Sequence, residues 1–118
     1  MTHASTDGER NNERLEFLGD AALDLVVAEE LFNGLADLPE GELTELKASV
    51  VSRRTLAEAA LGLRLEERAR VGGGMRERSL PKSVLANLYE AVLGAVYLDA
   101  GYAAARRVAG PPPEDPPR

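Results

Sequence analysis

The chain has 118 residues, 44% of them hydrophobic, and a formal net charge of −6, which suits one domain with a modest core and excludes a compositionally disordered chain. The absence of Cys and the single His exclude a disulfide framework, a thiolate metal site and a His-rich zinc site. No apolar run is long enough to cross a bilayer and no signal-peptide pattern opens the chain, so we expect a cytoplasmic protein without a membrane partner.

The first helical pattern follows a polar stretch over residues 1–12. From Asn12 to about Phe32 the sequence predicts a helix rich in Leu, Val and Ala, which Asn33-Gly34 ends. Gly19 lies inside this helix, where a glycine costs about 1 kcal/mol relative to Ala. A second helix is predicted after the turn at Leu38-Pro39. Beyond residue 51 it either continues in phase or breaks near 52–55 into a short helix that stops at Gly62.

A Gly- and Arg-rich loop over residues 68–82 precedes the last long helix, which begins near Pro81 and runs to about Leu98. Gly101 breaks this helix, and residues 102–109 predict one further short helix. The Pro-rich residues 110–118 cannot hold a helix and are typical of a linker or a frayed end. With no strand alternation and no repeat, the sequence predicts one all-α domain over residues 1–109.

Four acidic residues form a stripe on the first helix: Glu13, Glu16, Asp20 and Asp24. Their spacing of 3, 4 and 4 residues places them within an arc of roughly 80° on one face. A solvated face of an amphipathic helix would explain this stripe equally well.

The last long helix carries a second polar pair, Asn87 and Glu90, three residues apart among apolar neighbours. We expect Gly94, one turn beyond Glu90, to leave open space on that face. A Glu in so apolar a helix is costly to bury unless it is paired or coordinated, although a narrow exposed strip would also accommodate it. If the two helices face each other, Glu16, Asp20, Asn87 and Glu90 supply oxygen ligands to one point. Such a cluster suits Mg²⁺, which would activate a water molecule and hold phosphate oxygens. The net charge of −6 argues against nucleic-acid binding, unless the acids are concentrated in such a metal site or the Lys and Arg residues cluster on one surface.

The run NERLEFLGDA at residues 12–21 resembles the signature of the ribonuclease III family. Five further segments resemble other elements of that family: THAS at 2–5, EGEL at 40–43, LKASVV at 46–51, KSVLAN at 82–87 and EAVLGAVYLDAG at 90–101. The resemblance covers residues 2 to about 108. It implies a ribonuclease III-like helical bundle that forms a two-fold homodimer and cuts double-stranded RNA.

The resemblance also implies residue roles. Glu16 and Glu90 would be metal ligands, Asp20 would be the acid most closely tied to the chemistry, and Asn87 stands where the family commonly has Asp. Asp20 and Glu90 are thus the expected catalytic residues, with Mg²⁺ as cofactor and Mn²⁺ as a substitute. Glu13 would support the site or contact RNA. Phe17 would pack across the dimer interface, although a core position is the alternative.

The densest basic cluster comprises Arg68, Arg70, Arg76, Arg78 and Lys82. We expect Arg76, Arg78 and Lys82 to contact duplex phosphates, which proteins recognise mainly by shape. Pairing with neighbouring glutamates is the alternative. Weaker candidates for contact with RNA are Lys47, Arg53 and Arg54.

The predicted activity is hydrolysis of duplex RNA to 5′-phosphate and 3′-hydroxyl ends, in the processing of ribosomal or messenger precursors and without an organic cofactor. Relative to the family pattern, we miss the helix before Thr2-His3, so we expect part of the core to lack its cover. We also miss the double-stranded-RNA-binding domain, so we expect weaker RNA affinity. Two alternatives remain: a non-cleaving RNA-binding or dimerisation module, which Asn87 favours, and a truncated product that folds poorly.

Overall fold

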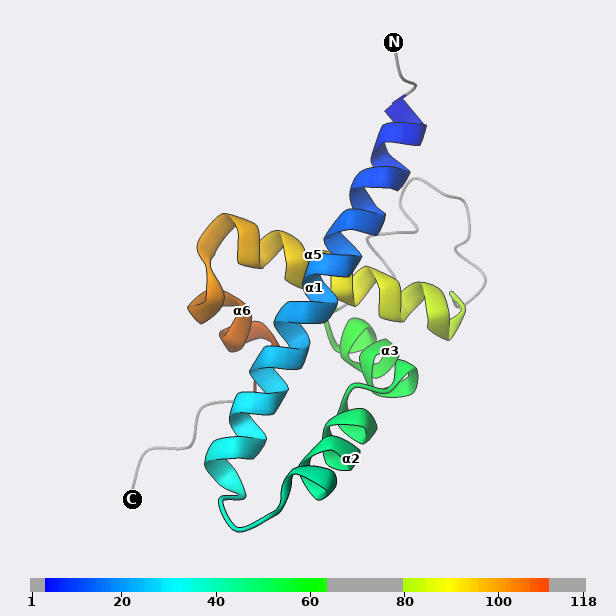
Figure 1. Cartoon of the computed structure of the whole chain (residues 1–118). Coiled ribbons are helices and arrows are strands. Elements are labelled where there is room, and N and C mark those ends of the chain that lie inside the picture. Colours follow the sequence, from blue (N-terminus) through cyan, green and yellow to red (C-terminus); the bar gives the residue numbers. More distant parts are fainter. Residues whose placement is uncertain (1–3, 64–79, 111–118) are drawn as a thin grey trace, which may run out of the picture.

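The computed structural model describes residues 4–63 and 80–110, and that part of the chain contains five helices and no strand. The longest helix, α1 (Ala4–Gly34), crosses α5 (Lys82–Ala100) near the middle of both helices (Figure 1). Helix α3 (Arg53–Gly62) packs on α5, while α2 (Glu40–Val50) lies along the C-terminal half of α1. The short α6 (Tyr102–Ala109) contacts both α1 and α5. The all-α prediction is therefore confirmed.

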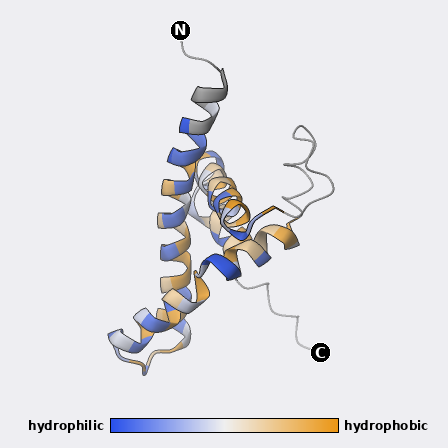
Figure 2. Ribbon diagram, turned by 90° about the vertical axis from the view of Figure 1, so that its right-hand side faces the viewer, coloured by the Kyte–Doolittle hydropathy of each residue, from blue (hydrophilic) through white to orange (hydrophobic). Residues whose placement is uncertain are grey.

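Helix α1 begins at Ala4, eight residues before the expected start at Asn12. Its polar first turns have no apolar periodicity, but Glu and Arg are good helix formers, and an established helix extends through them at little cost. In Figure 2 the helix alternates between hydrophilic and hydrophobic residues, whereas most of α5 is hydrophobic. The predicted end at Asn33-Gly34 is confirmed.

The open question of a break after residue 51 is settled in favour of a separate helix. The Ser52 side chain accepts a hydrogen bond from the backbone N–H of Thr55 at 3.2 Å and caps the start of α3. The cap fixes Arg53 as the first residue of α3, next to α5. Further along, Gly101 separates α5 from α6 with a φ of +87°, a conformation that favours glycine.

The core lies where α1, α3, α5 and α6 meet. Leu93 and Val26 have the largest fully buried side chains, and α3 contributes one buried face. Helix α2 buries none of its residues, so it rests on α1 as a peripheral element. No helix in the described ranges is long and apolar enough to cross a membrane.

Two glycines allow the backbones of α1 and α5 to touch at their crossing. A Cβ atom on Gly19 would lie 1.7 Å from the Glu90 carbonyl oxygen, and one on Gly94 would lie 2.2 Å from the Leu15 carbonyl oxygen. We had expected Gly94 to leave open space beside Glu90; this was wrong, because the backbone of α1 fills that space. The contact sets Glu16 and Asp20 against the face of α5 that carries Glu90.

Candidate functional site

Two carboxyl groups meet at the helix crossing. Asp20 follows Gly19 on α1, and its side chain is hydrogen-bonded to that of Glu90 on α5. Asp20 is exposed, whereas Glu90 is 7% exposed and is the buried charged residue of the described core. Burial, and then the hydrogen bond to Asp20 and its charge, raise the pKa of Glu90 to about 7. The pair is therefore an acid couple, held partly out of water, that favours either a shared proton or a nearby cation.

Glu16 and Asn87 lie beside this pair. Both line one groove between α1 and α5, whose remaining wall is mostly apolar and includes Leu15, Leu88 and Val92. The pKa of Glu16 is raised by burial and by the charge of Glu13, and the charge of Arg53 opposes this shift. The structure thus places Glu16 and Asn87 on one groove at the α1–α5 crossing, and the lining of that groove includes neither Asp20 nor Glu90.

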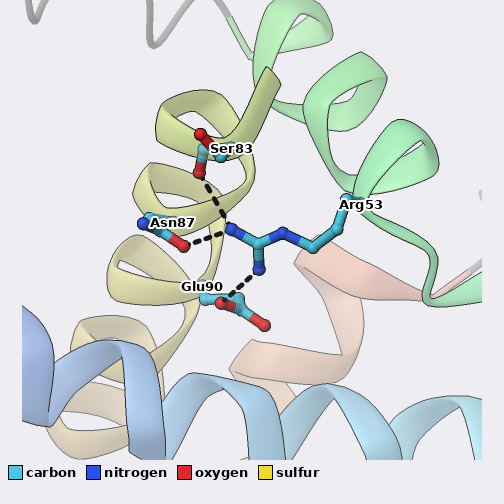
Figure 3. A network of polar contacts seen from close by, with 4 residues as sticks. All are labelled: Arg53, Ser83, Asn87 and Glu90. Atoms are coloured by element: carbon cyan, nitrogen blue, oxygen red, sulfur yellow. Dashed lines mark hydrogen bonds and ion pairs between the residues drawn. The ribbon is translucent and has the colours of Figure 1, made fainter. Parts of the chain in front are cut away.

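Arg53 completes the site from a third helix (Figure 3). Its Nη2 atom donates hydrogen bonds to the Ser83 carbonyl oxygen, at 2.9 Å, and to Asn87 Oδ1. Its Nη1 atom lies 3.4 Å from Glu90 Oε1. We had given Arg53 only a weak claim to RNA contact. It precedes Asn87 by 34 residues, and only the packing of α3 on α5 brings the two together.

The other predicted site residues that the structure describes do not line the groove that Glu16 and Asn87 share. Glu13 is exposed and lines a different groove with Phe17, while Asp24, the last acid of the stripe, faces Lys47 at 3.8 Å. Lys82 is exposed at the start of α5. Arg76 and Arg78, like Arg68, Arg70, Thr2 and His3, lie outside the described residues.

The donor set fits a hard divalent cation in kind. Carboxylate and amide oxygens are what Mg²⁺ prefers, and the oxygens of Asn87 and Glu90 already face one cation, the Arg53 guanidinium. Yet among residues 4–63 and 80–110 no three His, Cys, Asp or Glu side chains converge closely enough to hold a metal ion. The chemistry of the site therefore suits the metal, while its side chains are arranged around the arginine.

We expect the metal-free protein to lose stability as the pH rises from 5 to 8. Glu90 has a raised folded-state pKa of about 7, so between pH 4.5 and 7 the folded chain holds a proton that the unfolded chain releases. The loss should be on the order of 2 kcal/mol. Glu16, whose pKa is also raised, contributes in the same direction.

Urea unfolding in a chelator at pH 5, 6, 7 and 8 measures this effect. The Glu90→Gln variant is the control, because it has no proton to release at that position and should show a flatter profile. A stability that stays constant or rises from pH 5 to 8 in the unmodified protein would contradict the argument.

Comparison with known proteins agrees with the geometry. The family model described as Ribonuclease-III-like matches residues 1–111. The protein named Ribonuclease 3 from Rhodopirellula baltica is 48% identical over 104 residues, covering 86% of this chain and 39% of that protein. The one from Thiobacillus denitrificans is 47% identical over 114 residues, covering 92% of this chain and 48% of that protein. The chain thus spans less than half the length of these relatives.

A solved structure is similar as well. The nuclease domain of ribonuclease III from Campylobacter jejuni superposes with a TM-score of 0.70 at 42% identity, covering 83% of this chain and 70% of that one. That structure is described as showing structural flexibility in a region involved in dimer formation. The two chains are therefore alike in sequence as well as in fold.

Proposed function

The chain belongs to the ribonuclease III family, and on that premise we propose that it is an endonuclease that cuts both strands of double-stranded RNA. The observation that carries the proposal is the meeting of Asp20 and Glu90 at the α1–α5 crossing, with Glu16 and Asn87 beside them. The products would carry 5′-phosphate and 3′-hydroxyl ends. The substrates would be ribosomal or messenger RNA precursors in the cytoplasm.

Glu16, Asp20, Asn87 and Glu90 would hold the divalent cation, Mg²⁺ or in its place Mn²⁺. When bound, such an ion lowers the pKa of a water molecule and neutralises charge on phosphate oxygens. Asp20 is the exposed member of the acid pair, so it is the carboxylate that the scissile phosphate can approach. Glu90 lies behind it, close enough to share a proton with Asp20 when no cation is bound.

The RNA duplex would lie across this crossing, with Lys82, Arg76 and Arg78 neutralising its phosphates and Glu13 beside the site. Lys82 is exposed at the start of α5, five residues before Asn87, which would allow a contact to the strand being cut. Because duplex RNA is recognised by shape and by phosphate and 2′-hydroxyl contacts, we expect little sequence preference.

A homodimer would complete the RNA-binding surface. Phe17 is 80% exposed and Leu98 67% exposed, and both line a mostly apolar groove that also includes Leu15 and Leu18. Phe17 is therefore no core residue of this chain, and a large exposed aromatic beside an apolar groove is typical of an interface. A second copy related by a two-fold axis would cover it.

Replacing Phe17 with Ala should weaken the dimer by about 30-fold or more, since buried aromatic anchors commonly contribute 2 kcal/mol or more to an interface. Analytical ultracentrifugation measures the dissociation constant. Phe32→Ala is a matched control, because Phe32 is 72% exposed on the same helix but lines a different groove. Equal effects of the two substitutions would contradict an interface at Phe17.

Incubation of the full chain with long duplex RNA, with Mg²⁺ and with a chelator, tests the proposed activity. Mg²⁺-dependent fragments with 5′-phosphate and 3′-hydroxyl ends are the expected result. Intact RNA at a protein concentration that binds the duplex would overturn it.

A second candidate function is a module that binds RNA or dimerises without cutting. The neutral Asn87 and the lack of three converging acids in the described chain favour it. The Asn87→Asp variant separates the two functions, since it adds the missing negative charge. Cleavage by this variant alone would establish the non-cleaving module, whereas cleavage by both proteins would exclude it.

A further inference from the structure

The position of the Arg53 guanidinium is unusual for an exposed arginine. It contacts three oxygens from successive turns of α5, those of Ser83, Asn87 and Glu90 (Figure 3). Two of these, Asn87 Oδ1 and Glu90 Oε1, are atoms that the proposed function assigns to the metal. The positive charge of Arg53 also reaches Glu16, whose pKa it lowers against the effect of burial. The arginine thus stands among three of the four expected ligands.

Sharing these oxygens between both cations would be unfavourable, because it would bring the two positive charges close together. A hydrogen bond places the guanidinium nitrogen about 2.9 Å from its acceptor, and Mg²⁺ binds oxygen at about 2.1 Å. A metal on Asn87 Oδ1 and Glu90 Oε1 would therefore lie within a few ångströms of the Arg53 charge. Like charges this close repel each other strongly in a partly buried site.

We propose that Arg53 is a built-in competitor of the divalent cation: its guanidinium pairs with Asn87 and Glu90 in the metal-free protein and must swing away before the metal binds. This inference rests on the proposed function, because it takes the metal ligands from it. The arginine neutralises a carboxylate cluster that would otherwise repel itself, and its departure is part of the free energy of metal binding.

The anchoring of Arg53 is suited to such an exchange. Its backbone is fixed at the first position of α3 by the Ser52 cap, while its side chain is 50% exposed. The long aliphatic stem can rotate into solvent without any movement of α3 or α5. Glu90, by contrast, has a side chain only 9% exposed and stays in place.

The adjacent arginine provides a matched control. Arg54 lies on the same helix and carries the same charge, but it is 75% exposed and pairs with Glu58 within α3 at 3.7 Å. Arg53→Met and Arg54→Met therefore remove one positive charge each from neighbouring positions, and only the first removes it from the ligand cluster.

Mn²⁺ binding to the full chain, followed by electron paramagnetic resonance of the free ion, tests the proposal. We expect Arg53→Met to lower the apparent Kd for Mn²⁺ about fivefold, the size of effect expected for releasing a partly exposed ion pair, and Arg54→Met to leave it unchanged. Mn²⁺ should also raise the Tm of Arg53→Met more than that of the unmodified protein. A gain in affinity is a result that damage to the fold would not produce.

An unchanged or weaker affinity in Arg53→Met overturns the proposal, as does an equal gain in Arg54→Met or a failure of both proteins to bind Mn²⁺. RNA cleavage, measured separately, keeps the two claims apart. Tighter Mn²⁺ binding by Arg53→Met in a protein that never cuts RNA would refute the proposed nuclease and leave the competitor standing. RNA cleavage together with equal Mn²⁺ affinities of Arg53→Met and the unmodified protein would support the proposed nuclease and refute the competitor.

Discussion

Asp20→Asn and Glu90→Gln are each expected to reduce Mg²⁺-dependent cleavage of long duplex RNA about a thousandfold, the loss typical when one preorganised group that stabilises charge in the transition state is removed. Asp20 is the exposed carboxylate of the pair, and Glu90 is the buried one beside it. An amide retains the shape of each side chain but supplies no negative charge to a cation. Single-turnover cleavage at saturating protein measures the loss apart from RNA binding.

Asp24→Asn is the matched control for these variants. Asp24 belongs to the same acidic stripe one helical turn after Asp20, but it faces Lys47 instead of Glu90. We expect its cleavage rate to stay within about twofold of the unmodified protein, because exposed ion pairs contribute little. Full activity in Asp20→Asn or Glu90→Gln would remove these two carboxylates from the mechanism.

The stability of the Glu90→Gln variant shows whether a loss of activity comes from a damaged fold or from a damaged site. Glu90 carries an ionisable group in a nearly buried place, so the metal-free protein at pH 8 should be stabilised, not weakened, when that charge is removed. An inactive variant that unfolds at higher urea concentration than the unmodified protein would show that Glu90 serves function at a cost to stability.

The spacing of residues along the chain was enough to predict most of the fold and part of the site. The spacing of Glu16 and Asp20 on one helix, and of Asn87 and Glu90 on another, follows from the repeat of the helix and is visible in the sequence. The endings at Gly34 and Gly101 were likewise predictable from backbone preferences. These features depend on neighbours within a few residues.

The features that could not be predicted from the sequence depend mostly on contacts between helices that are distant along the chain. Arg53 enters the site because α3 packs on α5, and no local pattern distinguishes it from Arg54 beside it. The early start of α1 could not be predicted for a different reason, since its first turns are polar and carry no apolar periodicity. Both glycines of the crossing were noted from the sequence, but Gly19 only as a residue that destabilises a helix and Gly94 only as open space beside Glu90.

Replacing Gly19 with Ala should destabilise the protein by about 3 kcal/mol or more, at the upper end of what overpacking of a core costs. The added Cβ would lie 1.7 Å from the Glu90 carbonyl oxygen and 2.7 Å from its carbonyl carbon, so one whole helix has to move. Backbone atoms cannot change rotamer as a side chain does. For a domain of this size such a loss lowers the Tm by roughly 15 °C.

Gly8→Ala, on the same helix, isolates the cause of that loss. A Cβ on Gly8 meets nothing within 4 Å, so this variant should be as stable as the unmodified protein or gain up to about 1 kcal/mol from the higher helix propensity of Ala. Thermal unfolding followed by circular dichroism compares the two. If Gly19→Ala were as stable as Gly8→Ala, the backbones of α1 and α5 would not touch, and the crossing that brings Asp20 to Glu90 would have to be built differently.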